Sequence, residues 1–71
     1  MTTFKHHITV GKQMYAVQGD TLVLNKDKGN IVVTYTSIKL LGGYKELVDT
    51  IPEDVLGYID IVVRERIGEE L

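Results

Sequence analysis

The fold prediction depends on residues 31–51, IVVTYTSIKLLGGYKELVDTI, in which the hydrophobic period changes. Residues 31–36 are rich in β-branched side chains, and their side chains alternate between two faces as in a strand. From residue 38 onward, the apolar residues fall within about 120° of arc at 100° per residue, as on an amphipathic helix. These apolar residues are Leu40, Leu41, Tyr44, Leu47, Val48 and Ile51. The sequence therefore predicts strands up to about residue 36 and a first helix over about 38–50, with Ser37 at its N-cap.

The residues before this stretch have the composition of short strands and turns. Apolar residues alternate with polar ones over residues 4–10, and Gly11-Lys12 ends that pattern. Residues 13–17 and 20–25 form two more short runs, joined across Gln18-Gly19, where glycine suits a tight hairpin. A polar cluster over residues 25–30 then leads into the β-branched run. The sequence predicts a four-stranded antiparallel β-meander over about residues 4–36.

The residues after it resemble a second helix, over about 51–67. Thr50 is placed as an N-cap, Pro52 suits a first turn, Glu53 completes a capping box, and Gly68 is a plausible terminator. Asp60 precedes Arg64 by four residues, the favourable order for a surface ion pair. The alternative is a fifth strand over residues 58–67, because GYIDIVV is also rich in β-branched residues and alternates. The predicted class is α+β.

Size and composition indicate one small domain over residues 1–71 with a thin core. The chain has no cysteine, so neither disulfides nor zinc-binding thiolates support that core. Its longest uncharged stretch, residues 29–38, is too short for a membrane-spanning helix, and a cytoplasmic protein is expected. Residues 1–37 carry four lysines and two acids, whereas residues 38–71 carry four bases and eight acids.

Catalytic and metal-binding patterns do not emerge from the sequence. His6 and His7 are adjacent, and neighbouring strand residues point to opposite faces, so the two side chains cannot bind one ion together. His6 is expected at the edge of the core. The only serine, Ser37, has the N-cap role as a sufficient explanation, and phosphate-binding glycine motifs are missing. We therefore expect no enzymatic activity, no metal and no cofactor.

The favoured functional prediction is a protein-binding or assembly module. Its candidate interface consists of Tyr15, Tyr44, Tyr58 and Val62. Tyrosine suits a surface that is hydrated in the free protein and loses its water when a partner binds. The apolar faces of two helices would exceed what one side of the sheet can cover, which indicates a partner. That partner is another protein or a second copy, paired through the last helix or through the edge of the strand at residues 31–36. Small size also suits an accessory or inhibitor protein of a mobile element such as a virus.

The alternative prediction is a regulatory protein that binds nucleic acid. Its candidate contacts are Lys5, Lys12, Lys26 and Lys28, which would lie on one lysine-bearing face of the sheet. The same lysines are equally typical of the wet face of any soluble sheet.

Overall fold

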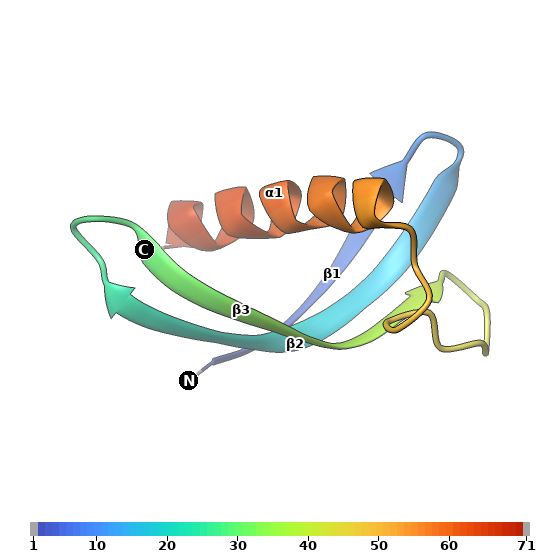
Figure 1. The fold of residues 1–71 in the computed structure, drawn as a ribbon, viewed down its shortest axis with the longest axis horizontal. Coiled ribbons are helices and arrows are strands. Elements are labelled where there is room, and N and C mark those ends of the chain that lie inside the picture. Colours follow the sequence, from blue (N-terminus) through green and yellow to red (C-terminus); the bar gives the residue numbers. More distant parts are fainter. Residues whose placement is uncertain (1, 71) are drawn as a thin grey trace.

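The structure consists of a curved antiparallel sheet and a helix that lies across its concave face (Figure 1). A computed structural model describes residues 2–70. Within this range the sheet contains β1 (Thr2–Val10), β2 (Gln13–Asn25) and β3 (Asn30–Leu40), in the order β1-β2-β3. The helix, α1, spans Glu53–Glu70. The fold is α+β with two layers, and the convex face of the sheet, here called the open face, is not covered by any described element (Figure 1).

A single layer of apolar side chains joins the helix to the sheet. On α1 the buried residues are Ile59, Val63 and Ile67, which are spaced by four and therefore share one helical face. They meet Phe4 and Ile8 of β1, Val17 of β2 and Ile38 of β3. Because the core is one layer deep, each of these side chains carries a large share of the apolar contact.

The predicted four-stranded meander is wrong, because its second and third strands form one continuous strand, β2. Gly19 lies within this strand, paired with Phe4 on one side and Tyr35 on the other. A β-carbon at Gly19 would overlap the carbonyl oxygen of Thr34 and approach the Phe4 ring to 2.8 Å. Glycine is therefore required here by close packing and not by a turn.

The predicted helix over 38–50 is also wrong, because residues 38–40 belong to β3. Gln18 pairs with Ser37 and Gly19 pairs with Tyr35, so Thr36 is an extra residue that forms a β-bulge. The extra residue shifts the alternation of side chains by one position, and both Tyr35 and Ile38 consequently face the helix. An apolar spacing of three, which resembles a helical period in the sequence, is here produced by a strand with a bulge.

The last prediction, a helix over 51–67, identifies the correct element, but the helix begins two residues later and ends three residues later than predicted. The helix begins at Glu53, and the carbonyl of Pro52 accepts the N–H of Leu56 at 3.0 Å, so Thr50 is not the N-cap. Gly68 lies inside the helix and does not end it. The alternative of a fifth strand over 58–67 is wrong. None of the helices in the described part of the chain is long and apolar enough to cross a membrane.

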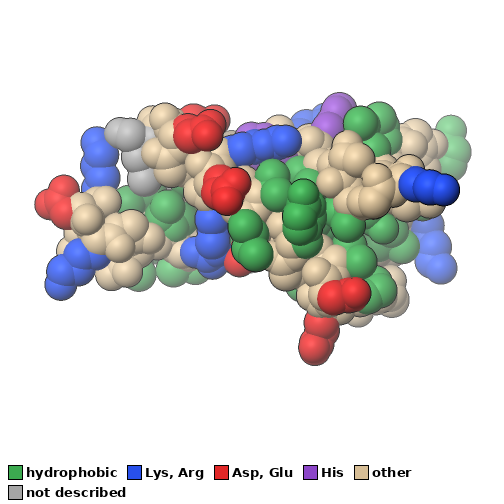
Figure 2. All heavy atoms as spheres, turned by 90° about the horizontal axis from the view of Figure 1, so that it is seen from above, with side chains coloured by type: hydrophobic (Ala, Val, Ile, Leu, Met, Phe, Trp, Pro, Cys, Tyr) green, Lys and Arg blue, Asp and Glu red, His purple; other side chains and the backbone are tan. Residues whose placement is uncertain are grey.

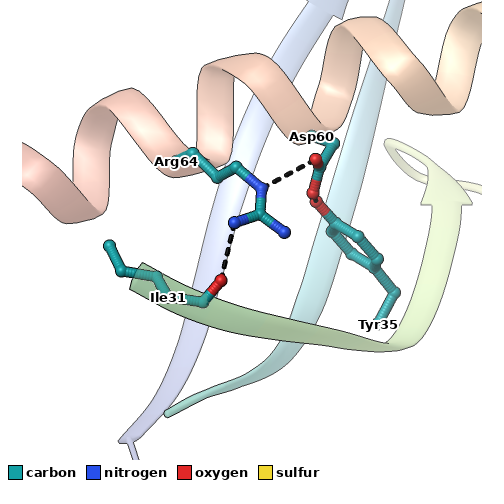
Figure 3. A network of polar contacts seen from close by, with 4 residues as sticks. All are labelled: Ile31, Tyr35, Asp60 and Arg64. Atoms are coloured by element: carbon teal, nitrogen blue, oxygen red, sulfur yellow. Dashed lines mark hydrogen bonds and ion pairs between the residues drawn. The ribbon is translucent and has the colours of Figure 1, made fainter. Parts of the chain in front are cut away.

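Polar contacts fasten α1 to both outer strands. Asp60 accepts a hydrogen bond from the Tyr35 hydroxyl at 2.5 Å and pairs with Arg64 at 2.8 Å, which confirms the predicted ion pair (Figure 3). Arg64 also donates to the carbonyl of Ile31 in β3 at 2.7 Å (Figure 3). On the other side of the helix, Arg66 donates to the carbonyl of His7 in β1 at 3.2 Å.

Candidate interaction surface

The β2–β3 hairpin extends beyond the start of β1. Thr2, the first described residue of β1, pairs with Thr21, whereas β2 continues to Asn25 and β3 begins at Asn30. Residues 22–32 are thus a two-stranded extension among the described residues, and we call them the arm (Figure 1). Its strands pair through Leu22 with Val32 and through Val23 with Ile31, and Leu24 is an unpaired bulge residue.

Apolar side chains are exposed on both faces of the arm. Leu22 is 41% exposed and its cross-strand neighbour Val32 is 45% exposed, both on the open face. Leu24 is 65% exposed, and Val23 lies on the helix side. A two-stranded ribbon is marginally stable by itself in water, and apolar residues on both faces make its exposure more unfavourable. The arm is therefore a surface that a partner would stabilise.

A hollow of about 400 Å³ adjoins the arm at the C-terminal end of α1. Phe4 and Ile67 form its apolar floor, and Thr21 and Val23 of β2 form a wall. His6 and Glu70 lie at its rim, with His6 stacked on Phe4 at a centroid distance of 5.6 Å. Lys5 and Glu70 are the charged residues of its lining, so the hollow combines an apolar floor with one base and one acid.

His6 occupies the predicted position at the edge of the core. Burial lowers the pKa of His6 below its ordinary value, and the charge of Arg66 adds to this effect, while Glu70 opposes it. The imidazole is therefore mainly neutral at pH 7 and contributes more to packing than to charge.

A carboxylate holds the loop over residues 41–52 against the end of β3. Glu46 accepts hydrogen bonds from the Ser37 hydroxyl and from the N–H of Ile38, each at 2.6 Å. It also accepts the N–H groups of Leu47 and Val48 at 3.1 and 3.2 Å. The hydrogen bond from Ser37 contributes most to lowering the pKa of this carboxyl, and the backbone N–H groups add to it. The residue predicted as an N-cap thus orients a loop.

Replacing Glu46 with glutamine should loosen this loop. The folded state holds the pKa of Glu46 below its ordinary 4.5, so the contribution to stability is present above about pH 4.5 and is lost as the pH falls. In Glu46→Gln we expect faster amide hydrogen exchange at Ile38 and Val48 at pH 6, and a smaller loss of protection on acidification. NMR-detected exchange measures both. The matched control is Asp49→Asn, an exposed acid of the same loop, and unchanged exchange at Ile38 in Glu46→Gln would contradict the assignment.

The four residues of the predicted protein interface do not lie on one surface. Tyr15 and Val62 pack against the core and are half-buried. Tyr44 is 97% exposed in the loop, and Tyr58 is 49% exposed on the outer side of α1. Tyr58 and Ile61, which is 59% exposed, lie near each other one helical turn apart. The helix thus offers a small apolar patch instead of the long apolar face that its sequence indicates.

The predicted lysine contacts are also dispersed. Lys5 lies on the open face, Lys12 in the β1–β2 turn, and Lys26 and Lys28 in the turn of the arm. The two turns lie at opposite ends of a molecule whose longest extent is 36 Å, and Figure 2 shows basic side chains projecting at both ends. Lys39, which the sequence analysis placed on a helix, also lies on the open face. It pairs with Ala16 of β2, which in turn pairs with His7 of β1, and all three side chains are on the same face as Lys5.

The residues between 2 and 70 bring no three metal-ligating side chains together. His6 faces the helix and His7 the open face, as their adjacent strand positions require. The polar cluster at Tyr35 consists of groups that satisfy one another. Burial, followed by the hydrogen bond to Asp60, raises the pKa of Tyr35 well above its ordinary value, so its hydroxyl stays protonated.

Sequence reasoning missed the arm, although the sequence contains one signal for it. Leu22, Val23 and Leu24 are consecutive apolar residues next to a charged turn, whereas a strand with one buried face alternates. Such a run places apolar side chains on both faces, so one face must meet something outside the core.

Comparisons with protein-family models, with curated proteins and with solved structures found no match for this chain.

Proposed function

We propose that this protein is a non-enzymatic assembly module that associates with copies of itself through the arm. The observation that carries the proposal is the exposure of Leu22, Leu24 and Val32 on a two-stranded extension. Removing apolar surface from water contributes roughly 25 cal/mol per Å², so a partner that covers the arm stabilises both itself and the ribbon. The occupied state of the arm is therefore favoured over the free state.

The thin core supports the same proposal. A domain of this size has little apolar area to bury, and the chain has no cysteine for a disulfide. Oligomerisation is one of the common ways in which small domains gain stability. Association through the arm would extend the apolar contacts beyond the single layer between α1 and the sheet.

Sedimentation velocity across a dilution series, at low and at high salt, tests this function. We expect a mass above the 8.0 kDa of one chain at high concentration. The association should persist at high salt, because salt screens charges and leaves apolar contacts intact. A monomer at every concentration up to the millimolar range would contradict self-association.

Nucleic-acid binding is the second candidate, and the distribution of charge favours it. Residues 2–40, which contain the three strands and their turns, carry five lysines and two aspartates, whereas residues 41–71 carry three bases and eight acids. On the open face, Lys5 pairs with Gln18 of β2 and Lys39 pairs with Ala16, two residues before Gln18, while Asp20 is an acidic neighbour. A face with basic residues, opposite a layer that carries most of the acids, suits a phosphate backbone.

Fluorescence anisotropy with labelled DNA and RNA distinguishes this candidate. If it is correct, Lys5→Glu with Lys39→Glu should abolish binding, and the wild-type affinity should fall steeply with salt. The control is Lys12→Glu in the distant turn. The candidate would be contradicted if the wild-type protein did not bind at low salt, or if Lys5→Glu with Lys39→Glu left the affinity unchanged.

A further inference from the structure

We propose that two copies of this chain form a symmetric dimer in which the arm of each copy enters the hollow of the other. This inference rests on the proposed function, because it names the surfaces through which self-association occurs. In the dimer, Leu24 of one copy sits on the floor made by Phe4 and Ile67 of the second copy.

The first argument is the match between the exposed side chain and the hollow. Leu24 is the most exposed aliphatic residue of the arm, at 65%. The hollow has an apolar floor and a volume of about 400 Å³, which lies within the usual range of roughly 300–1,000 Å³ for binding pockets. It therefore has room for a leucine side chain together with part of the bulged strand that carries it.

The second argument is charge complementarity. The turn of the arm carries Lys26 and Lys28 with one acid, Asp27, and is therefore net positive. The lining of the hollow includes Glu70 and one lysine, Lys5. Glu70 lies at the end of a helix whose last six residues carry three acids, Glu65, Glu69 and Glu70, against one base, Arg66, and are therefore net negative. Acidic side chains and free carbonyls make the C-terminal end of a helix negative, so it attracts lysine side chains. When Leu24 is seated, the turn of the arm reaches past it to this acidic rim.

The third argument is the position of the two surfaces within one copy. A two-fold interface uses the same patch on both copies, so the projecting part and its receptor must belong to one continuous patch on each copy. Val23 satisfies this condition, because it belongs to the arm and also forms part of the wall of the hollow. One rotation axis next to Val23 can therefore place both arms in both hollows, and the assembly closes as a dimer.

The decisive measurement is the dimer dissociation constant of Leu24→Ser against that of Ile61→Ser. The two residues have similar exposure, 65% and 59%, but Ile61 lies on the outer side of α1, away from the arm. We expect Leu24→Ser to raise the dissociation constant at least about tenfold, because the symmetric dimer loses the contact twice, and Ile61→Ser to leave it unchanged. Both side chains are exposed, so both variants should fold, which circular dichroism verifies.

Charge reversal supplies an independent test. Lys26→Glu with Lys28→Glu should weaken the dimer, Glu70→Lys should also weaken it, and the three changes combined should recover part of the affinity. Isotope-filtered NMR on a mixture of labelled and unlabelled wild-type protein should show contacts between the Leu24 methyl groups of one copy and the Phe4 ring of the other.

Two failures are distinguishable. A dimer that is insensitive to Leu24→Ser, or that Ile61→Ser disrupts instead, would overturn the exchange of arms and leave self-association in place. A wild-type protein that stays monomeric at millimolar concentration would overturn self-association itself.

Discussion

Gly19→Ala should destabilise the protein by about 3 kcal/mol, and Gly19→Val should leave it unfolded at 25 °C. Added atoms in a well-packed site usually cost about 1–3 kcal/mol, and at Gly19 the overlap is with the backbone carbonyl of Thr34, which cannot rotate away. At roughly 0.05–0.15 kcal/mol per residue, a domain of this size has only about 4–10 kcal/mol of stability to lose. Urea denaturation followed by circular dichroism measures the change.

Gly57→Ala is the matched control for this substitution. A β-carbon at Gly57 meets no atom within 4 Å, and the residue is exposed inside α1. Alanine there should stabilise the protein by up to about 1 kcal/mol, because glycine is a poor helix former. The same chemical change is thus expected to have opposite signs at two glycines. Equal stability of Gly19→Ala and wild type would contradict the close approach of β1, β2 and β3.

Ile59→Ala should cost about 2–5 kcal/mol, whereas Ile61→Ala should cost less than about 0.5 kcal/mol. Ile59 is fully buried against the sheet, and Ile61, two residues on, projects from the outer side of the helix. In a strand the two side chains would share one face and respond alike. The pair therefore tests the helix and the single-layer core together, and urea denaturation of both variants provides the comparison. Similar losses of stability at the two positions would contradict the helical assignment.

The parts of the fold that the sequence predicts are those controlled by local periodicity. Strand β1, the turns at Gly11 and Gly29, and the helix at the C-terminus all follow from the spacing of apolar residues and from the turn residues around them. The strand β2 was divided in the prediction because glycine indicates a turn when only its neighbours in sequence are considered. The reason for Gly19 lies in Phe4 and Thr34, which are distant along the chain.

The helix predicted over residues 38–50 is wrong for a related reason. A single extra residue at Thr36 shifts the phase of β3, and a phase shift in a strand resembles a helical period over a few residues. The loop that follows is held by Glu46 through contacts with Ser37 and Ile38, which no local pattern encodes. The arm was missed because the sequence does not show which residue of β2 pairs with the first described residue of β1.

The two arginines that fasten α1 to the sheet also restrict how copies of this chain can join. An uncovered edge strand presents backbone groups that can pair with another strand, and repeated pairing of this kind produces fibres. Here Arg64 occupies the carbonyl of Ile31 on one edge and Arg66 that of His7 on the other, while the loop at Leu47 covers Ile38. A further strand that pairs at Ile31, His7 or Ile38 would first have to displace a guanidinium group or this loop. Strand addition at these positions is therefore disfavoured, which agrees with the proposed association through the arm.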